Sequence, residues 1–452
     1  PPWESVTSHR QSFTLTVGTV DMLRTDVERA LRDARDEDGH LFPDYADYCF
    51  ANANPTLLSL LGADIDRSLP TARPTPTDRS LPDDVFAGVD TDVDHVVVLF
   101  LDGYGWDAWK RDHDSVPLLS RLTERGTVTP LTSIYPSETA AATTTFHTGL
   151  TPAEHGLLGW WQYLLGVDGV VQTLPFETLD GDPADEAFPG LAVSDLYAGE
   201  SIYASAEREG VESYLSHPFP TEMAERGATE RATYGNVADL AVQLRHELED
   251  SGGADYCFGY VPTVDAAAHA EGTTSDRYRA QLEVTAACFR RELVERLDPA
   301  VAERTLFVLT ADHGIVDTVP AENVDIGPDA YPAVWEALAR DDDGDPIPPV
   351  GSPRNLHLHL RDGTVDAVRE RLESRLPCRT FTREEAVDRR LFGDGDPSDL
   401  FRQRCGDLVV VHRDRGLCWD EDERELVGMH GGLTPEEMLV PFAAARLDRL
   451  SG

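Results

Sequence analysis

The fold is decided by two stretches of sequence, VVVLFLDGYGW at residues 96–106 and SIYPSETAAATTTFHTGLTPAEHG at residues 133–156. The unbroken apolar run at Val96–Leu101 is typical of a strand that is buried on both faces, and so of a parallel sheet that helices cover. Asp102 follows this run directly, at the end of the strand where open α/β sheets bind their ligands.

The second stretch places a hydroxyl group, that of Thr139, shortly after a turn that contains Pro136. An Ala/Thr-rich helix is predicted at about residues 138–147, so Thr139 should lie near its amino end. Free backbone N–H groups and the positive end of the helix dipole favour an anion at that position. We therefore predict that Asp102 and Thr139 face one metal ion and that Thr139 is a nucleophile.

The composition limits the partners of the chain. Its 452 residues carry 82 acidic and 39 basic side chains, for a net charge of −43, and Lys110 is the single lysine. Such an acidic, lysine-poor composition is typical of proteins that stay soluble in high salt, where surface carboxylates are hydrated and screened. It argues against binding of a nucleic-acid backbone, which needs clustered cations. A phosphate loop of the GxxxxGK type is absent from the sequence.

Cysteine spacing and hydropathy give two further expectations. None of the six cysteines is spaced as C-x-x-C, so we expect free thiols and no cysteine-bound zinc. No apolar run of 18 residues and no secretory leader pattern occurs. We therefore expect a cytoplasmic protein without a membrane span.

Strand and helix patterns alternate along much of the chain, which predicts the α/β class with a mostly parallel central sheet sandwiched by helices. Single helices are predicted at residues 107–125 and 229–249. We predict a helical lead-in and linker at 1–92, an α/β core at 93–345 with an inserted segment at about 160–227, a small inserted α+β unit at 346–420, and a return to the core at 421–452.

Six acidic and imidazole side chains form a candidate metal-binding set. Three of the acids follow predicted strands, so their carboxylates can converge at one edge of the sheet. Asp265 and His269 are four residues apart, which one helical turn brings onto the same face. Mixed Asp/His ligation suits zinc, and carboxylates also admit manganese or magnesium. The six residues are Asp102, Asp265, His269, Asp312, His313 and His430.

The order of these motifs resembles the alkaline phosphatase superfamily, and within it the type I phosphodiesterase/nucleotide pyrophosphatase branch. The resemblance covers roughly residues 95–160, 255–318 and 428–445. It rests on LFLDG, on YPSET followed by TGLTPAEHG, on YVPTVDAAAH, on TADHG and on HGGLTPEEMLVP. It implies two divalent metal ions, one held by Asp102, Thr139, Asp312 and His313, the other by Asp265, His269 and His430.

The resemblance also implies an activity. The expected protein is a metal-dependent phosphodiesterase or pyrophosphatase that cleaves small phosphate diesters, nucleotides or phosphoanhydrides through a phospho-threonine intermediate. Tyr260 falls where the branch places a pocket tyrosine. Two positions depart from the branch. Trp160 stands where an asparagine that binds phosphate is usual; Gln162 nearby either takes over this role or is a surface amide. Ala140 stands beside the nucleophile, where the branch often has an aromatic residue.

Several alternatives remain open at this point. One alternative is a phosphomonoesterase, phosphomutase or phosphonate hydrolase of the same superfamily. A monoesterase usually needs extra cations for its dianionic phosphoryl group, and Arg354 is a candidate for this role. The spacing Gly103-x-Gly105-x-x-Ala108 fits the dinucleotide fingerprint of a Rossmann oxidoreductase, although Asp102 would repel the pyrophosphate. A non-catalytic binding module of the same fold should hold fewer than two metal ions.

Overall fold

A computed structural model describes residues 22–65, 79–219, 227–250 and 253–451. The beginning of the predicted lead-in and much of its linker lie outside these residues. Among the described helices, none combines the length and the apolar character that a membrane-spanning segment requires.

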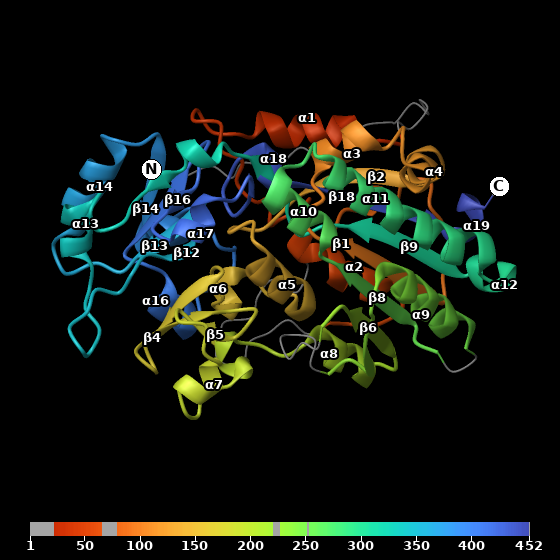
Figure 1. The fold of residues 1–452 in the computed structure, drawn as a ribbon. Coiled ribbons are helices and arrows are strands. Elements are labelled where there is room, and N and C mark those ends of the chain that lie inside the picture. Colours follow the sequence, from red (N-terminus) through yellow and green to blue (C-terminus); the bar gives the residue numbers. More distant parts are fainter. Residues whose placement is uncertain (1–21, 66–78, 220–226, 251–252, 452) are drawn as a thin grey trace, which may run out of the picture.

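The main sheet has seven strands in the order β2-β18-β9-β1-β8-β6-β7 (Figure 1). Neighbouring strands pair in parallel except where β18 meets β2 and β9, so the predicted mostly parallel sheet is confirmed. The strands span β1 His95–Leu101, β2 Thr127–Thr132, β6 Ser213–His217, β7 Glu230–Thr233, β8 Tyr256–Val261, β9 Thr305–Thr310 and β18 Leu439–Arg446.

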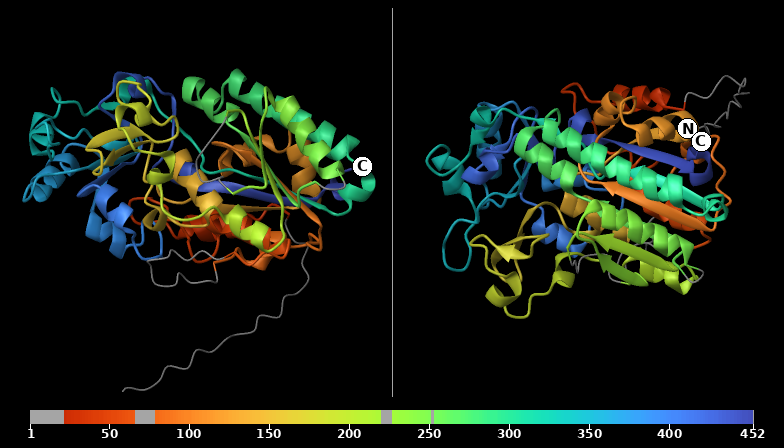
Figure 2. Two further views of the ribbon diagram at one scale, coloured as in Figure 1. Left: turned by 90° about the horizontal axis from the view of Figure 1, so that it is seen from below. Right: turned by 45° about the vertical axis from the view of Figure 1, so that its right-hand side comes forward.

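Helices cover both faces of this sheet (Figures 1 and 2). Adjacent residues of a strand point to opposite faces, and β8 shows what each face meets. The ring of Phe258 lies 5.6 Å from that of Phe146 in α5 (Thr139–Thr148). A Cβ on the next residue, Gly259, would contact Leu240 and Leu244 of α9 (Val237–Glu249). The apolar strands are therefore buried on both sides, as their sequences predict.

Strand register sets the position of the site. Phe100 of β1 pairs with Tyr260 of β8 and with Thr310 of β9. The residues that follow β1 and β9 therefore leave the sheet at the same edge.

A second seven-stranded sheet has the order β14-β15-β13-β12-β3-β4-β5. Trp161 of β3 faces Gly351 of β12, so the segment after residue 160 and the predicted unit at 346–420 form one sheet rather than two separate insertions. Its strands span β3 Trp161–Leu164, β4 Gly169–Gln172, β5 Glu177–Thr178, β12 Val350–Ser352, β13 Asn355–Leu358, β14 Cys378–Thr382 and β15 Leu408–His412.

Three local predictions are wrong. Residues 107–125 form two helices, α3 (Trp106–Asp112) and α4 (Pro117–Arg125), because Pro117 begins a new helix and disfavours helical backbone in the residue before it. Residues 230–233 form the edge strand β7, and α9 begins only after Asn236, whose side chain accepts the N–H groups of Ala238 and Asp239. Residues 160–227 are predicted to be one inserted segment, but residues 213–217 within it form strand β6 of the main sheet.

The remaining helices pack against the two sheets. They span α1 Thr25–Asp33, α2 Ala53–Leu60, α6 Pro152–His155, α7 Ala184–Ala187, α8 Ile202–Arg208, α10 Thr263–Glu271, α11 Asp276–Phe289, α12 Pro299–Ala302, α13 Pro332–Ala337, α14 Val365–Glu373, α15 Arg383–Asp388, α16 Asp399–Arg404, α17 Glu421–Arg424, α18 Pro435–Met438 and α19 Leu447–Leu450. Helix α11 continues as a π-helix over Arg290–Arg296.

Candidate metal centre and active site

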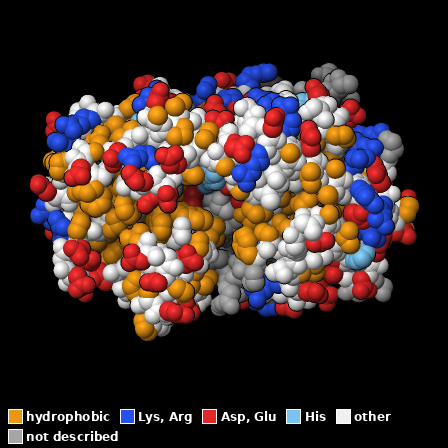
Figure 3. Space-filling view, in the orientation of Figure 1, with side chains coloured by type: hydrophobic (Ala, Val, Ile, Leu, Met, Phe, Trp, Pro, Cys, Tyr) orange, Lys and Arg blue, Asp and Glu red, His pale blue; other side chains and the backbone are white. Residues whose placement is uncertain are grey.

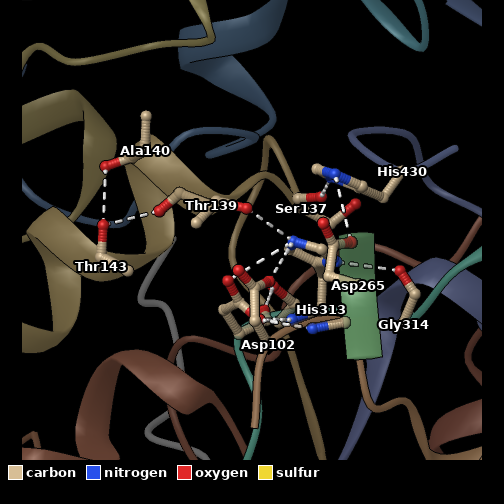
Figure 4. Close-up of polar contacts among 12 residues, drawn as sticks. Asp102, Ser137, Thr139, Ala140, Thr143, Asp265, His313, Gly314 and His430 are labelled. Atoms are coloured by element: carbon tan, nitrogen blue, oxygen red, sulfur yellow. Dashed lines mark hydrogen bonds and ion pairs between the residues drawn. The ribbon is translucent and has the colours of Figure 1, made fainter. Parts of the chain in front are cut away.

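Thr139 is the first residue of α5, and its side chain is buried. Its hydroxyl oxygen Oγ1 lies 3.0 Å from Nε2 of His313 (Figure 4). The Ala/Thr sequence of α5 has few bulky side chains, so the helix can pack closely on the sheet with its amino end at the strand edge. The structure therefore brings the predicted nucleophile next to a predicted metal ligand.

Two acids leave the sheet beside one another, as the register of β1 and β9 requires. Asp102 follows β1, and Asp312 lies two residues after Thr310, the last residue of β9. Oδ1 of Asp312 accepts the backbone N–H groups of Gly103 at 3.1 Å and of His313 at 3.0 Å. This carboxylate therefore joins the two strand ends.

The loop after β9 is fixed by close packing at Gly314. A Cβ atom there would come within 2.0 Å of the carbonyl oxygen of Glu436. Only glycine fits this approach, which explains the glycine of TADHG and holds His313 in place.

The three histidines share one arrangement. Each Nδ1 faces a backbone carbonyl oxygen: His313 faces Gly314 at 3.1 Å, His269 faces Gly428 at 2.7 Å, and His430 faces Ser137 at 3.2 Å. A carbonyl only accepts, so each Nδ1 carries the proton and Nε2 is the atom available as a metal ligand.

These Nε2 atoms face carboxylates and one another. Nε2 of His269 lies 3.1 Å from Oδ2 of Asp265 and 3.2 Å from Nε2 of His430. Nε2 of His313 lies 3.4 Å from Oδ1 of Asp102 and 3.4 Å from Oδ2 of Asp312. Two groups, Asp265/His269/His430 and Asp102/Asp265/His313, each place their ligand atoms within 4.8 Å of one another.

Unpartnered polar atoms test whether this set fits divalent cations. Oδ1 of Asp102, Oδ1 of Asp265 and Oδ2 of Asp312 are buried, and none has a hydrogen-bond partner among the described residues. Buried carboxylate oxygens without partners are costly unless a cation compensates them. The donor set of acids and imidazoles therefore fits a divalent metal centre.

The electrostatics point the same way. Burial raises the pKa of Asp102 well above its usual value, and the charges of Asp312 and Asp265 raise it further. Burial lowers the pKa of His269, but the Asp265 carboxylate outweighs burial and brings it to about 9. A metal ion that binds His269 must displace this proton, so affinity should rise with pH.

A third group of acidic and histidine side chains lies elsewhere, and an arginine side chain already pairs with its acids. Asp36, Asp38 and His40 could approach one ion. Nη1 of Arg379, however, lies 2.8 Å from a carboxylate oxygen of both Asp36 and Asp38. We therefore regard this group as an ion-pair cluster.

The three residues predicted to bind substrate differ in burial and in what they contact. The Tyr260 hydroxyl donates to Oδ2 of Asp102 at 2.5 Å, and its ring lies 6.4 Å from that of Phe219, which is 50% exposed. Trp160 is half-buried. The interpretation of Gln162 as a surface amide is wrong: it is buried, with Oε1 accepting the N–H of Leu158 at 3.0 Å.

Arg354 is not available to a phosphoryl group. It is fully buried, with Nε 2.8 Å from Oε1 and Nη2 2.6 Å from Oε2 of Glu437. Nη1 donates to the carbonyl of Arg415, and Nη2 donates also to that of Arg413. Because the group is buried and each of its nitrogens already donates within the protein, the candidate role of Arg354 in a monoesterase is wrong.

One residue beside the site did not appear among the predicted ligands. Glu138 is 1% exposed, and its Oε2 has no hydrogen-bond partner among the described residues. Its position next to Thr139 in YPSET was the available signal.

Figure 3 shows histidine surface at the head of a hollow, with hydrophobic side chains on both sides of it. A substrate that reaches the centre from this face would therefore meet imidazole and apolar groups.

Comparisons with known proteins support the fold and identify the family. No curated protein matches the chain. Murine ectonucleotide pyrophosphatase/phosphodiesterase 5, solved as an inactive variant with AMP, superimposes with a TM-score of 0.60 at 16% identity, over 78% of this chain and 88% of its own. Phosphonoacetate hydrolase from Sinorhizobium meliloti, solved with phosphonoformate, gives a TM-score of 0.56 at 19% identity, over 79% and 94%.

These structural similarities show the fold of the chain, and a match to a family model shows the family to which it belongs. The type I phosphodiesterase/nucleotide pyrophosphatase model matches residues 96–433, which include Thr139 and all six predicted acid and imidazole ligands. The Rossmann alternative is thereby excluded. The chain belongs to the type I phosphodiesterase/nucleotide pyrophosphatase family and is a phosphoric ester hydrolase with an alkaline phosphatase-like fold.

Proposed function

We propose that the protein is a metal-dependent phosphodiesterase or pyrophosphatase that acts through a phospho-threonine intermediate. The observation that carries this proposal is the position of Thr139 Oγ1, 3.0 Å from Nε2 of His313 and beside buried carboxylate oxygens without partners. A hydroxyl group at the start of a helix, directed at a candidate metal centre, is placed to attack phosphorus.

Two sets of side chains would hold the ions. Asp102, Asp312 and His313 join Thr139 in one set, and the second set is Asp265, His269 and His430. Two divalent cations would supply positive charge that favours the alkoxide of the nucleophile and neutralises the phosphoryl oxygens. Zinc is the ion that we propose, because mixed Asp/His sets suit it.

The reaction balances in two displacements. In the first, Oγ1 of Thr139 loses its proton to solvent and forms a bond to phosphorus as the bond from phosphorus to the leaving oxygen breaks; the leaving oxygen takes up a proton, and the leaving group departs. In the second, water attacks the same phosphorus on the side opposite Oγ1 and gives up one proton, and the bond to Oγ1 breaks. The phosphate monoester leaves, and Oγ1 of Thr139 takes up a proton.

The charges around the site favour a diester over a monoester. A diester is a monoanion, whereas a monoester near neutral pH is largely a dianion and needs further cations. Arg354 is occupied by Glu437, and Lys110 pairs with Glu28 and Asp107. The AMP complex of the murine relative supports a nucleotide-like substrate, and the bacterial relative makes a phosphonate the second substrate to assay.

Replacement of the nucleophile tests the proposal. Thr139→Ala should bind metal nearly as the wild type does but lose turnover by roughly three orders of magnitude or more, since removal of a nucleophile can cost about a millionfold. Steady-state rates with a bis(aryl) phosphate, an aryl phosphate and a phosphonate, each with zinc and with manganese in high salt, measure this loss. Metal content is measured on the same samples.

Thr139→Ser is the matched control, because it keeps the hydroxyl group and should keep measurable activity. Hydrolysis by Thr139→Ala at the wild-type rate would contradict a covalent role for Thr139.

A further inference from the structure

The feature that carries a further inference is Glu138, the residue directly before the nucleophile. Its backbone is extended (φ −145°, ψ 138°), and α5 begins at the next residue. The side chain is 1% exposed, and Oε2 has no hydrogen-bond partner among the described residues. A carboxylate in this state normally pairs with a cation.

The neighbours of Glu138 belong to both halves of the candidate metal centre. Its carboxylate interacts electrostatically with Asp312 of one proposed ligand set and with Asp265 and His269 of the other. The backbone N–H of Ala140 donates to the carboxylate, but two of the three charged neighbours are acids, which repel it. The ions that these acids would hold are therefore the cations that could compensate the charge of Glu138.

We propose that Glu138 supplies a further carboxylate ligand to the metal centre, where it binds one of the two ions that Asp312 and Asp265 would hold. The inference rests on the proposed function, because it needs the same ions. It goes beyond the ligand set that the family resemblance implies, which does not include Glu138.

An added carboxylate changes the preference of the centre among metals. Oxygen ligands suit manganese and magnesium, whereas imidazole suits zinc. Glu138 should therefore contribute more to the affinity for Mn²⁺ than to the affinity for Zn²⁺.

Metal affinity, measured without any substrate, tests the inference. The intact protein in high salt is titrated with Mn²⁺ or Zn²⁺ against a competing chelator, and bound metal is counted by mass spectrometry of the elements. Glu138→Gln keeps the size of the side chain but removes its charge, and it should lower Mn²⁺ affinity at least about tenfold, with a smaller loss for Zn²⁺.

Glu436→Gln is the matched control, because it removes one negative charge from an exposed side chain near the same loops. It should change the affinity for either ion by less than about twofold, as screened surface charges contribute little. Glu138→Asp, which keeps the charge on a shorter side chain, should lie between wild type and Glu138→Gln. If Glu138→Gln does not fold, the metal affinities of Glu138→Asp are compared with those of the wild type instead.

The outcomes separate this inference from the proposed function. If the wild type binds two ions and Glu138→Gln binds both with unchanged affinity, Glu138 is not a ligand and the proposed function stands. If Glu138→Gln loses Mn²⁺ and Zn²⁺ equally, a ligand role survives but the preference for manganese is overturned. If the wild type binds no divalent cation, both proposals fail.

Discussion

Tyr260 shows how one side chain can serve the site without belonging to either ligand set. Its hydroxyl donates to Oδ2 of Asp102 at 2.5 Å, while Oδ1 of the same carboxylate faces His313. Burial raises the pKa of Tyr260 well above its usual value, and the Asp102 charge raises it further. The phenol therefore stays protonated and fixes the orientation of the carboxylate. Its predicted contact with substrate stays a prediction.

Loss of this hydroxyl group should weaken the centre but not the fold. Tyr260→Phe should lower metal affinity by about tenfold, since partners that orient metal ligands typically contribute ten- to a hundredfold. Chelator competition measures the change, and thermal unfolding checks the fold. Tyr163→Phe is the control, because the Tyr163 hydroxyl binds Asp168 in the second sheet. Equal metal affinity in the two variants would show that Asp102 needs no such partner.

At the scale of elements, a buried ion pair connects the second sheet to the loop that follows His430. Arg354 lies between β12 and β13, and Glu437 lies in α18. Glu437 also accepts the N–H of Gly432 and the hydroxyl of Thr434, which fixes the turn after His430. The pair therefore helps to position a candidate ligand from a distance.

Removal of one partner should destabilise this connection strongly. Arg354→Met leaves the Glu437 carboxylate buried without its cation, which typically costs about 3–5 kcal/mol. The double variant Arg354→Met/Glu437→Gln should recover part of that loss. Chemical unfolding of the three proteins, followed by near-ultraviolet circular dichroism, measures both effects. A single variant as stable as the wild type would show that the pair contributes no net stability.

The same pair predicts a pH dependence. Burial raises the pKa of Glu437, but Arg354 and the hydrogen bonds from Thr434 and Gly432 outweigh burial, so the pKa lies below its usual 4.5. A carboxyl group with a lowered folded-state pKa stabilises the protein above its unfolded-state pKa, and this contribution is lost as the pH falls through the folded-state value. The unfolding temperature of the wild type should therefore fall more steeply than that of Arg354→Met as the pH drops below about 4.5. If the unfolding temperatures of the two proteins fell equally with pH, the lowered pKa of Glu437 would not depend on Arg354.

The elements also show what the sequence could and could not predict. The apolar runs of β1 and β9 and the four-residue spacing of Asp265 and His269 are local signals, and they predict that the acids after the strands and His269 lie close together. The inclusion of Thr139 and His430 in two ligand sets came from the family resemblance. The pairing of Trp161 with Gly351 joins distant segments, and no local pattern reports it. The burial of Gln162 follows from that pairing, so it was missed for the same reason.

For the whole molecule, the excess of negative charge is the main property that the fold must accommodate. The chain has 82 acidic and 39 basic side chains, a net charge of −43. Some surface acids are paired, as Asp94 is with Arg304 at 2.7 Å, but the basic side chains are too few to pair with all of them. Self-repulsion among the remaining carboxylates favours expanded states of the chain.

This repulsion predicts that salt stabilises the folded protein. The Debye length falls from about 10 Å at 0.1 M to about 3 Å at 1 M ionic strength, so repulsion between surface charges should weaken greatly over that range. The unfolding temperature should rise as KCl is increased across it, measured by circular dichroism with chelator present to remove metal effects. Arg354→Met is the control: its lost ion pair is buried and poorly screened, so its unfolding temperature should be lower at every salt concentration but rise with a similar slope. An unfolding temperature that stays level or falls between these concentrations would mean that the acidic surface is already balanced, and that the composition is no adaptation to high salt.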